Sequence, residues 1–380
     1  MSTGVALLGS TGSIGRSALE VLDRHPDRFR VAALAAGRNA ERLATQVARY
    51  APDIAVLVEG DGPPAAGEDW LRGREGLLAA AAHPDADIVI NAVVGAAGLE
   101  ATLAALEAGK RLALANKESL VVGGPLVLDA LRRGGGELIP IDSEHSAILQ
   151  CLTGSAPREA RRLILTASGG PFRGWTPEAL AAVTPAQALR HPTWRMGAKI
   201  TVDSATLANK ALEVIEAHFL FDMPYDAIEV VVHPQSVIHS MVEFVDGSVL
   251  AQMGFPTMEL PILYALTHPA RLPDEGTRRF DPLRAGELTF EPADVACFPA
   301  LRLGVEAGRQ GGTAPAIYNA ANEVAVEMFL AGKLPFQGIP HAIEAALEAQ
   351  PVVAVDALET VLEADRRARA AVRGRIDGAC

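Results

Sequence analysis

A glycine-rich segment close to the amino terminus has the residues needed to bind a phosphate group. It reads Gly9-Ser-Thr-Gly12-Ser-Ile-Gly15 and directly follows the apolar run Val5–Leu8. Glycines at such a turn let backbone N–H groups at the start of a helix approach a pyrophosphate. The spacing differs from the usual G-x-G-x-x-G, so a plain glycine-rich turn is the alternative. The strand before it and the helix after it favour a dinucleotide site.

The residues after the second predicted strand indicate which dinucleotide would bind. An NAD enzyme usually places Asp or Glu there to bind the ribose 2′-hydroxyl, whereas this chain has Gly37-Arg38-Asn39. An arginine suits a 2′-phosphate, so NADP(H) is favoured over NAD(H). The alternative is that Arg38 is only a solvated loop residue.

Two acidic residues at the end of a later predicted strand could bind a metal ion. In Ile141-Asp142-Ser143-Glu144-His145, residues two apart would point to the same side of an extended segment, which brings Asp142 and Glu144 together. Ligands bind outside the carboxyl ends of such strands, although paired carboxylates also occur by chance on surfaces. Ligation by oxygen alone favours Mg²⁺ or Mn²⁺ over zinc, and a third ligand must come from elsewhere.

The segment 199–216 is a candidate source of that third ligand. If a helix begins near Ser204, then Asn209, Lys210 and Glu213 lie close together on it. An amide, an ammonium and a carboxylate on one helix face could bind a phosphate and a metal ion side by side. An ordinary surface ion pair is the alternative, and Glu216 is an alternative ligand that spacing does not exclude.

Two further loops carry polar groups that could contact a ligand. Thr166-Ala-Ser168-Gly-Gly-Pro-Phe172 ends a predicted strand in small residues with hydrogen-bond donors, which suits an anion but also a plain turn. The second loop, His191-Pro-Thr-Trp194-Arg-Met-Gly197, contains an imidazole and an indole. A tryptophan in a loop often covers a pocket as a lid, and the histidine is either a ligand-binding or a packed loop residue.

An α/β fold is predicted to position the first of these segments. Over about the first 150 residues, short apolar runs alternate with Ala/Leu-rich helical stretches, which predicts a Rossmann-like parallel sheet covered on both faces. The predicted helices are Ile14–Leu22, Ala40–Arg49 and Leu99–Ala108. The predicted strands are Val5–Leu8, Arg30–Leu34, Ile54–Val58, Ile88–Ala92, Arg111–Ala115 and Leu138–Ile141.

The pattern changes after this sheet. Asp246-Gly247 is a strong hairpin signal between two predicted strands, which makes the central part α+β. Its predicted elements are a helix over Ser204–Phe221 and strands over Leu163–Thr166, Lys199–Val202, Glu229–Val232, Val237–Val245 and Ser248–Met253. Helical patterns follow over Ala316–Leu330 and Pro340–Ala371. We therefore expect an NADPH-binding domain over 1–141, a central catalytic domain over 142–267, a linker over 268–293 and a C-terminal helical domain over 294–380.

Composition limits the classes of partner and the location. The net charge of −12, from 34 basic and 46 acidic residues, disfavours nucleic acid and anionic membrane surfaces. Three cysteines without a CxxC pair favour neither a disulfide framework nor a thiolate zinc site. No basic segment precedes the first apolar run, and polar residues and prolines interrupt the stretch 249–266, so neither a signal peptide nor a membrane span is expected. The expected location is the cytoplasm.

Several segments together resemble the 1-deoxy-D-xylulose 5-phosphate reductoisomerase family over nearly the whole chain. The shared motifs, in order, are GSTGSIG, AGRN, ANKESLV (Ala115–Val121), IDSEHSAI, LTASGGPF, HPTWRMGAKITVDSATLANKALE, HPQSVIHSM (His233–Met241) and NAANEVAV (Asn319–Val326). Arg38 stands where the family commonly has lysine, which keeps the charge. Thr257 and Glu259 stand where the family has Asp and Arg, which puts only a supporting or interface feature in question.

The resemblance implies a role for each matching residue. It implies that NADPH is bound by Thr11, Gly12, Ser13, Ile14, Gly37, Arg38, Asn39, Asn116, Glu118 and Gly197. Asp142, Glu144 and Glu213 would hold the cation, Mg²⁺ or Mn²⁺ with Co²⁺ as a further candidate, in preference to Glu216. Ser168, Ser204, Asn209 and Lys210 would bind the substrate phosphate, with Glu213 beside them. Lys117, Ser143, Glu144 and His191 would surround the reacting end, with Lys117, Glu144 and His191 as the catalytic residues.

The resemblance also implies the reaction and the assembly. The family rearranges the carbon skeleton of a phosphorylated sugar and reduces the product with NADPH, a reaction of the non-mevalonate isoprenoid pathway. The loop around Trp194 would be a flexible lid, and the chain would form a homodimer. A simple NADP-dependent dehydrogenase would not need the acidic residues at 142, 144 and 213, and a regulator without activity would be expected to have lost some of them.

Overall fold

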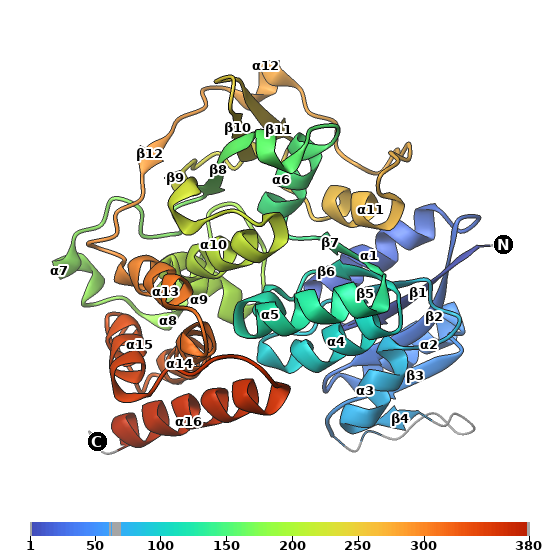
Figure 1. Ribbon diagram of the computed structural model, residues 1–380, viewed down its shortest axis with the longest axis horizontal. Coiled ribbons are helices and arrows are strands. Elements are labelled where there is room, and N and C mark those ends of the chain that lie inside the picture. Colours follow the sequence, from blue (N-terminus) through green and yellow to red (C-terminus); the bar gives the residue numbers. More distant parts are fainter. Residues whose placement is uncertain (1, 61, 63–69, 378–380) are drawn as a thin grey trace. The chain divides into compact units, whose positions relative to one another are not determined.

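The computed structural model describes residues 2–60, 62 and 70–377, and the chain divides into two compact units. The first unit comprises Met1–Ser119, Val127–Ser146 and Thr257–Arg278. The second comprises Leu120–Leu126, Ala147–Pro256 and Arg279–Cys380. Each unit has its own sheet (Figure 1).

The first unit is built on a seven-stranded parallel sheet in the order β4-β3-β2-β1-β5-β6-β7. Its strands are β1 (Thr3–Leu8), β2 (Phe29–Ala36), β3 (Ile54–Leu57), β4 (Leu71–Arg72), β5 (Ile88–Asn91), β6 (Arg111–Leu114) and β7 (Glu137–Pro140). The strand order reverses between β1 and β5, and in such sheets ligands bind outside the carboxyl ends of the strands at that point. The predicted Rossmann-like sheet is confirmed.

Helices on both faces of this sheet explain why its strands are apolar without alternation. Val5, Leu7 and Leu8 of β1 are all fully buried. The helices of this unit are α1 (Ser13–Arg24), α2 (Ala40–Tyr50), α3 (Gly73–Ala81), α4 (Leu99–Glu107), most of α5 (Lys117–Gly134) and α11 (Glu259–Thr267). Helices α1 and α11 pack against each other, so a segment far along the sequence completes this unit (Figure 1).

The two departures from the family pattern, Thr257 and Glu259, lie at the start of α11. The Thr257 hydroxyl accepts a hydrogen bond from the Glu259 N–H at 3.2 Å, and the Glu259 carboxylate accepts one from Arg24 at 2.7 Å. Arg24 also donates to both carboxylate oxygens of Asp274, at 2.8 and 2.9 Å. The unusual Glu259 therefore fixes the segment 257–278 to α1.

Replacing Asp274 with asparagine is expected to lower the free energy of unfolding at pH 7 by about 1–3 kcal/mol, as for other hydrogen bonds to charged groups. Burial opposes ionisation of Asp274, but hydrogen bonds from Arg24, Thr277 and the Gly276 N–H lower its pKa from 3.8 to about 2. The wild type should therefore lose this contribution as the pH falls from about 4 towards 2, and the variant should not. Urea unfolding at several pH values measures both effects. The matched control is the exposed Asp129, whose replacement by asparagine should leave stability almost unchanged.

The second unit contains a five-stranded mixed sheet in the order β11-β10-β8-β9-β12. Its strands are β8 (Ala160–Ala167), β9 (Ile228–Val232), β10 (Ile238–Phe244), β11 (Val249–Met253) and β12 (Glu291–Pro292), and only β8 and β9 pair in parallel. The predicted hairpin joins β10 to β11, and Gly247 adopts a positive φ of 86° there. One face of the sheet packs its apolar side chains into a core with Ile148, Val214 and Ala217.

The remaining helices belong mostly to the second unit. They are α6 (Ser143–Leu152), which begins in the first unit, α7 (Pro177–Leu180), α8 (Pro185–Ala188), α9 (Ala198–Thr206), α10 (Ala208–Phe221), α12 (Pro282–Ala285), α13 (Pro299–Gln310), α14 (Ala314–Leu330), α15 (Gly338–Ala349) and α16 (Leu358–Asp377). The helical C-terminal region is as expected, except that the predicted helix 340–371 is divided into α15 and α16. Pro351 explains this break, because a proline disfavours helical backbone in the residue before it, here Gln350.

The strand predicted over Lys199–Val202 is wrong, because these residues form the start of α9. The backbone N–H and the hydroxyl of Thr201 both donate to the carbonyl of Gly197, at 3.1 and 2.8 Å. The β-branched residues of this segment suggested a strand, but Thr201 and Val202 are buried in helical form. Helix α9 ends at Thr206, and the next residue, Leu207, has a φ of 61° that separates α9 from α10, so the helix predicted from Ser204 is divided between two helices.

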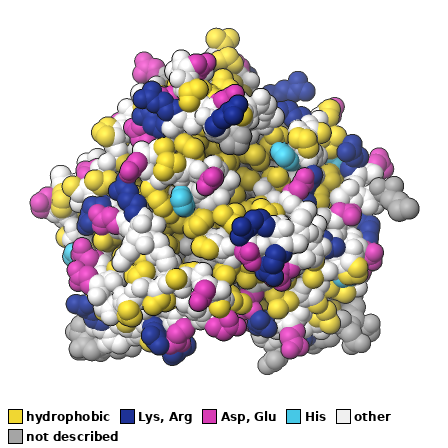
Figure 2. Space-filling view, viewed as in Figure 1, with side chains coloured by type: hydrophobic (Ala, Val, Ile, Leu, Met, Phe, Trp, Pro, Cys, Tyr) yellow, Lys and Arg dark blue, Asp and Glu magenta, His cyan; other side chains and the backbone are white. Residues whose placement is uncertain are grey.

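None of the helices in the described ranges is both long and apolar enough to cross a membrane. On the face drawn in Figure 2, basic and acidic side chains are interspersed among the described residues.

Candidate active site

The glycine-rich loop connects β1 to α1 through a turn that only glycine fits. A Cβ atom on Gly15 would lie 2.4 Å from the carbonyl oxygen of Gly9, and Gly9 itself has a φ of 84°. Gly12 is the N-cap of α1 and provides no side chain to cap the helix. The first N–H groups of α1 are therefore suited to an anionic ligand such as a pyrophosphate.

A buried glutamine that the sequence did not reveal holds α2 beside this loop. The Ser10 hydroxyl donates to Oε1 of Gln46 at 2.7 Å, and Nε2 of Gln46 donates to the Ser10 carbonyl at 2.9 Å. Asn39 caps α2 by accepting a hydrogen bond from the Arg42 N–H at 3.0 Å. Gly37, Arg38 and Asn39 thus follow the carboxyl end of β2, next to the glycine-rich loop.

A buried hydrogen-bond network positions Asn116, the N-cap of α5. Nδ2 of Asn116 donates to the carbonyls of Val93 and Gly95 at 2.7 and 2.8 Å, and its Oδ1 accepts from the Ser119 N–H. Further along, Asn91 donates to Thr102, which donates to Ser119. A polar chain of this kind fixes Asn116 and the neighbouring Glu118 at the carboxyl ends of β5 and β6.

Asp142 and Glu144 lie close together, but not in the extended segment that was expected. Ser143 begins helix α6, and Asp142 precedes it, accepting a hydrogen bond from the Glu144 N–H at 3.2 Å. The extended prediction is therefore wrong beyond Asp142, because this carboxylate caps a helix. Ser143 donates to the Glu144 carboxylate, and Lys117 donates to Oδ2 of Asp142 at 2.6 Å.

The surroundings of Asp142 keep it negatively charged. Burial would raise the pKa of this carboxyl, but the Lys117 ammonium and the His145 imidazole hold it well below its ordinary value. Nδ1 of the buried His145 lies 3.2 Å from Oδ1 of Asp142. A carboxylate that stays ionised, with fixed orientation, is what a hard divalent cation requires.

In the second unit, Ser168, His191 and Ser204 form one hydrogen-bonded group. Nε2 of His191 lies 3.0 Å from the Ser168 hydroxyl and 3.2 Å from the Ser204 hydroxyl. Its Nδ1 accepts backbone N–H groups of Thr193 and Trp194, at 3.1 and 2.9 Å. Because Nδ1 is an acceptor, the proton of the neutral ring is on Nε2, facing the two serines.

If His191 contacts the substrate, as the resemblance implies, protonation of its imidazole is expected to weaken substrate binding. Burial lowers the pKa of this imidazole below 6.5, so the ring is neutral at pH 7. A second proton on Nδ1 would break both hydrogen bonds from Thr193 and Trp194 and open the loop. The value of kcat/KM should therefore fall as the pH drops through a pKa below 6.5, and this limb should be absent in His191→Gln. If His191→Gln still shows this fall in kcat/KM at the same pH, the fall does not come from His191.

The first turns of α10 bring together the amide, ammonium and carboxylate that the spacing predicted. Nδ2 of Asn209 donates to Oε1 of Glu213 at 2.5 Å, and Lys210 donates to Oε2 of the same carboxylate. Lys210 also donates to the carbonyl of Thr166, at 2.5 Å, just before the Ser168 loop. Lys210 and Glu213 are only 3% and 1% exposed, so the alternative of a solvated surface pair is wrong.

A buried pair between α9 and α14 was not predicted from the sequence. Nδ2 of Asn322 donates to Oδ1 of Asp203 at 2.8 Å, and Lys199 lies 2.9 Å from Oδ2. Asp203 directly precedes Ser204, so this pair fixes the position of the serine hydroxyl. The only available signal was that Asn322 is a polar residue in a mostly apolar helix, and it did not show which residue it would contact.

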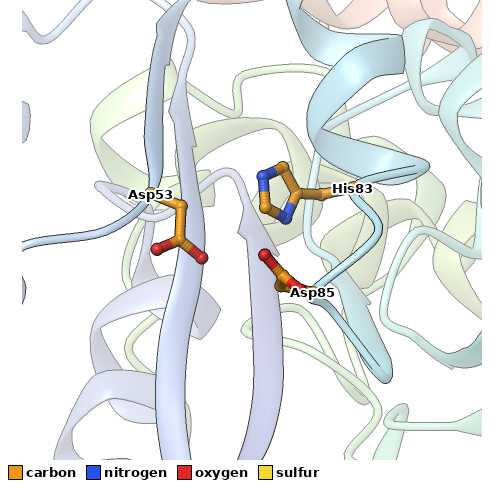
Figure 3. A group of neighbouring side chains, drawn as sticks. All are labelled: Asp53, His83 and Asp85. Carbon is orange, nitrogen blue, oxygen red and sulfur yellow. The ribbon is translucent and has the colours of Figure 1, made fainter.

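A second group of potential metal ligands lies at the opposite end of the first sheet (Figure 3). Asp53, His83 and Asp85 each offer a ligand atom within 4.8 Å of the others. However, Arg30 donates to the Asp53 carboxylate at 2.8 Å and to the Asp85 carbonyl at 3.2 Å. The Arg30 guanidinium therefore already supplies the positive charge in this group. These residues precede β3 and β5 rather than follow them, away from the ligand-binding edge.

The structure therefore groups the predicted residues within each unit. In the first unit, Thr11–Ile14, Gly37–Asn39, Asn116 and Glu118 follow strand ends, and Lys117, Asp142, Ser143 and Glu144 form one cluster. In the second, one group is Ser168, His191 and Ser204 and the other is Asn209, Lys210 and Glu213. Gly197 also belongs to the second unit, as the N-cap of α9.

Comparison with known protein families gives three matches along the chain. The model described as 1-deoxy-D-xylulose 5-phosphate reductoisomerase matches residues 5–124, and that described as the C-terminal domain of this enzyme matches residues 138–221. A further model, described as the DXP reductoisomerase C-terminal domain, matches residues 253–371.

Curated and solved proteins resemble the chain over almost its full length. The 1-deoxy-D-xylulose 5-phosphate reductoisomerase of Symbiobacterium thermophilum is 52% identical over 98% of both chains, and that of Xanthomonas euvesicatoria is 54% identical over 96% of this chain and 94% of its own. The Zymomonas mobilis enzyme, solved with NADPH, is 43% identical with a TM-score of 0.91, covering 99% of both chains. A DOX-P reductoisomerase solved with NADPH, fosmidomycin and magnesium is 39% identical with a TM-score of 0.92, covering 99% of this chain and 98% of its own.

Proposed function

Because the chain belongs to the 1-deoxy-D-xylulose 5-phosphate reductoisomerase family, we propose that it converts 1-deoxy-D-xylulose 5-phosphate to 2-C-methyl-D-erythritol 4-phosphate with NADPH and a divalent cation. This places it in the non-mevalonate route to isoprenoid precursors. The observation that carries the proposal is the buried Lys210, whose ammonium contacts both the strand end before Ser168 and the Glu213 carboxylate. In this proposal, the Lys210 ammonium serves both the phosphate site and the metal ligand Glu213.

The first unit fits NADPH. The uncapped start of α1 suits the pyrophosphate, and the exposed Arg38 suits a 2′-phosphate. A Cβ on Gly37 would meet no atom within 4 Å, which leaves open space beside Arg38. We assign cofactor binding to Thr11, Gly12, Ser13, Ile14, Gly37, Arg38, Asn39, Asn116, Glu118 and Gly197.

The acidic residues fit a hard divalent cation. Asp142 and Glu144 from the first unit and Glu213 from the second offer carboxylate oxygens alone, which suits Mg²⁺ or Mn²⁺, with Co²⁺ as a further candidate. Each Glu213 oxygen accepts a hydrogen bond in the structure, yet a carboxylate has about four lone-pair positions and can also bind a metal ion.

Polar groups of both units are assigned to the substrate. Ser168, Ser204, Asn209 and Lys210 are assigned to the phosphate, and Lys117, Ser143, Glu144 and His191 to the reacting end, where Lys117, Glu144 and His191 act as the catalytic residues. When bound, the cation supplies a Lewis acid for the carbon rearrangement and NADPH supplies the hydride. Lys117 keeps Asp142 ionised for this, and phosphate binding by Lys210 contributes energy that orients the reacting end.

The finer points of organisation are also proposals. We propose a homodimer acting in the cytoplasm, where NADPH and phosphorylated sugars are available, with the Trp194 loop as its lid. We keep the division into 1–141, 142–267, 268–293 and 294–380 as a proposal, in which the end of β7 at Pro140 supports the first boundary and the start of α13 at Pro299 supports the last, while 257–278 packs within the first compact unit. Analytical ultracentrifugation measures the assembly directly.

The reaction is tested by following NADPH absorbance after adding 1-deoxy-D-xylulose 5-phosphate. Oxidation should require both the substrate and Mg²⁺ or Mn²⁺, should stop with a chelator, and should be slower with NADH. If a folded protein binds NADPH but does not oxidise it under these conditions, the proposed reaction is wrong.

A further inference from the structure

A carboxylate lies inside the subsite assigned to the 2′-phosphate. Glu59 follows β3, and its backbone N–H donates to the carbonyl of Gly37 at 2.8 Å, which extends the pairing of β2 with β3. Nε of Arg38 donates to the Glu59 carboxylate at 2.5 Å. The backbone therefore holds Glu59 next to the residue that would bind the phosphate.

The ion pair between Arg38 and Glu59 contributes little to the stability of the fold. The Arg38 and Glu59 side chains are 82% and 54% exposed, and an exposed pair of this kind contributes little to stability. A second guanidinium is close by, because Arg42 donates to the carbonyl of Thr11 at 3.3 Å and its N–H is bound by Asn39. Among the described residues named here, Arg38 and Arg42 bring positive charge to the subsite and Glu59 brings negative charge.

We propose that Glu59 is a specificity-determining residue that limits the preference for NADPH over NADH. This inference rests on the proposed function, in which Arg38 binds the 2′-phosphate. The incoming phosphate must displace Glu59 from Arg38 and then lies near its negative charge, which weakens NADPH binding. NADH brings no such charge, and its ribose hydroxyls can donate hydrogen bonds to the same carboxylate.

The test is a titration of the full chain with NADPH and with NADH, followed by cofactor fluorescence without substrate or metal. Glu59→Gln should tighten NADPH binding about three- to tenfold, the effect of removing one nearby, partly screened charge. NADH binding should stay unchanged or weaken. Glu41→Gln makes the same change of charge at the exposed start of α2 and should alter neither affinity.

A double variant tests whether the effect passes through Arg38. In an Arg38→Ala background, Glu59→Gln should give at most a small gain for NADPH. Equal tightening of both cofactors, no change in either, or a full gain without Arg38 would overturn the inference. If the wild type binds NADPH well but Glu59→Gln changes nothing, only this inference fails. If the wild type binds neither cofactor, the proposed function fails with it.

Discussion

Replacing Glu213 with glutamine is expected to lower metal-dependent turnover by about 10²- to 10³-fold. The reason is that a metal ion acting as a Lewis acid lowers the activation free energy by several kcal/mol. Glutamine keeps the size of the side chain but loses the charge that binds the cation. NADPH binding should remain, because the residues assigned to the cofactor contact other parts of the chain. Steady-state rates over a range of Mg²⁺ and Mn²⁺ concentrations measure the effect.

Two controls separate metal binding from folding. The change also leaves the buried Lys210 ammonium without its carboxylate, and breaking a buried ion pair can cost about 3–5 kcal/mol of stability. Glu213→Asp keeps this charge and should still raise the metal concentration needed for activity. Glu216→Gln, one turn further along α10, tests the alternative ligand and should retain metal-dependent turnover. Full activity of Glu213→Gln would show that our metal assignment is wrong.

Replacing Lys210 with methionine is expected to lower kcat/KM by about 10- to 100-fold or more, since hydrogen bonds to charged groups contribute about 1.5–3 kcal/mol. Lys210 is buried beside the Ser168 loop, so no other lysine of the chain can replace it there. The loss should appear in kcat as well as in KM, because phosphate binding orients the reacting end.

Substrate without its phosphate makes this second prediction specific. With 1-deoxy-D-xylulose, the wild type and Lys210→Met should be almost equally slow, since the group that Lys210 binds is missing. The exposed Lys333 provides the matched control, and Lys333→Met should behave as the wild type with both substrates. A loss of equal size with both substrates would mean that Lys210 acts through the fold instead of through the phosphate.

The sequence predicted the elements whose residues decide their own conformation. Strands buried on both faces, such as β1, stand out as short apolar runs, and the Asp246-Gly247 hairpin depends on a positive φ that glycine supplies. It was wrong where local preference and tertiary burial disagree, as at Lys199–Val202, where β-branched residues form the start of α9. It also missed the helix that begins directly after Asp142, because the cap was interpreted as part of a strand.

The candidate site shows the same division. The amide, ammonium and carboxylate at 209, 210 and 213 lie within one helical turn, so spacing alone predicted their contacts. Gln46 with Ser10 and Asn322 with Asp203 are 36 and 119 positions apart, and no periodicity connects such residues. These buried polar pairs could only be recognised in the folded chain.

The sequence by itself determined the type of sheet, the family and the candidate residues for the chemistry, because these depend on residue types at short spacing. The tertiary structure alone decided how those residues are held and charged. Lys117 meets Asp142 across 25 positions and keeps it ionised, and burial keeps His191 neutral between two serines. Charge state and orientation depend on burial and on distant partners, which exist only after the chain has folded.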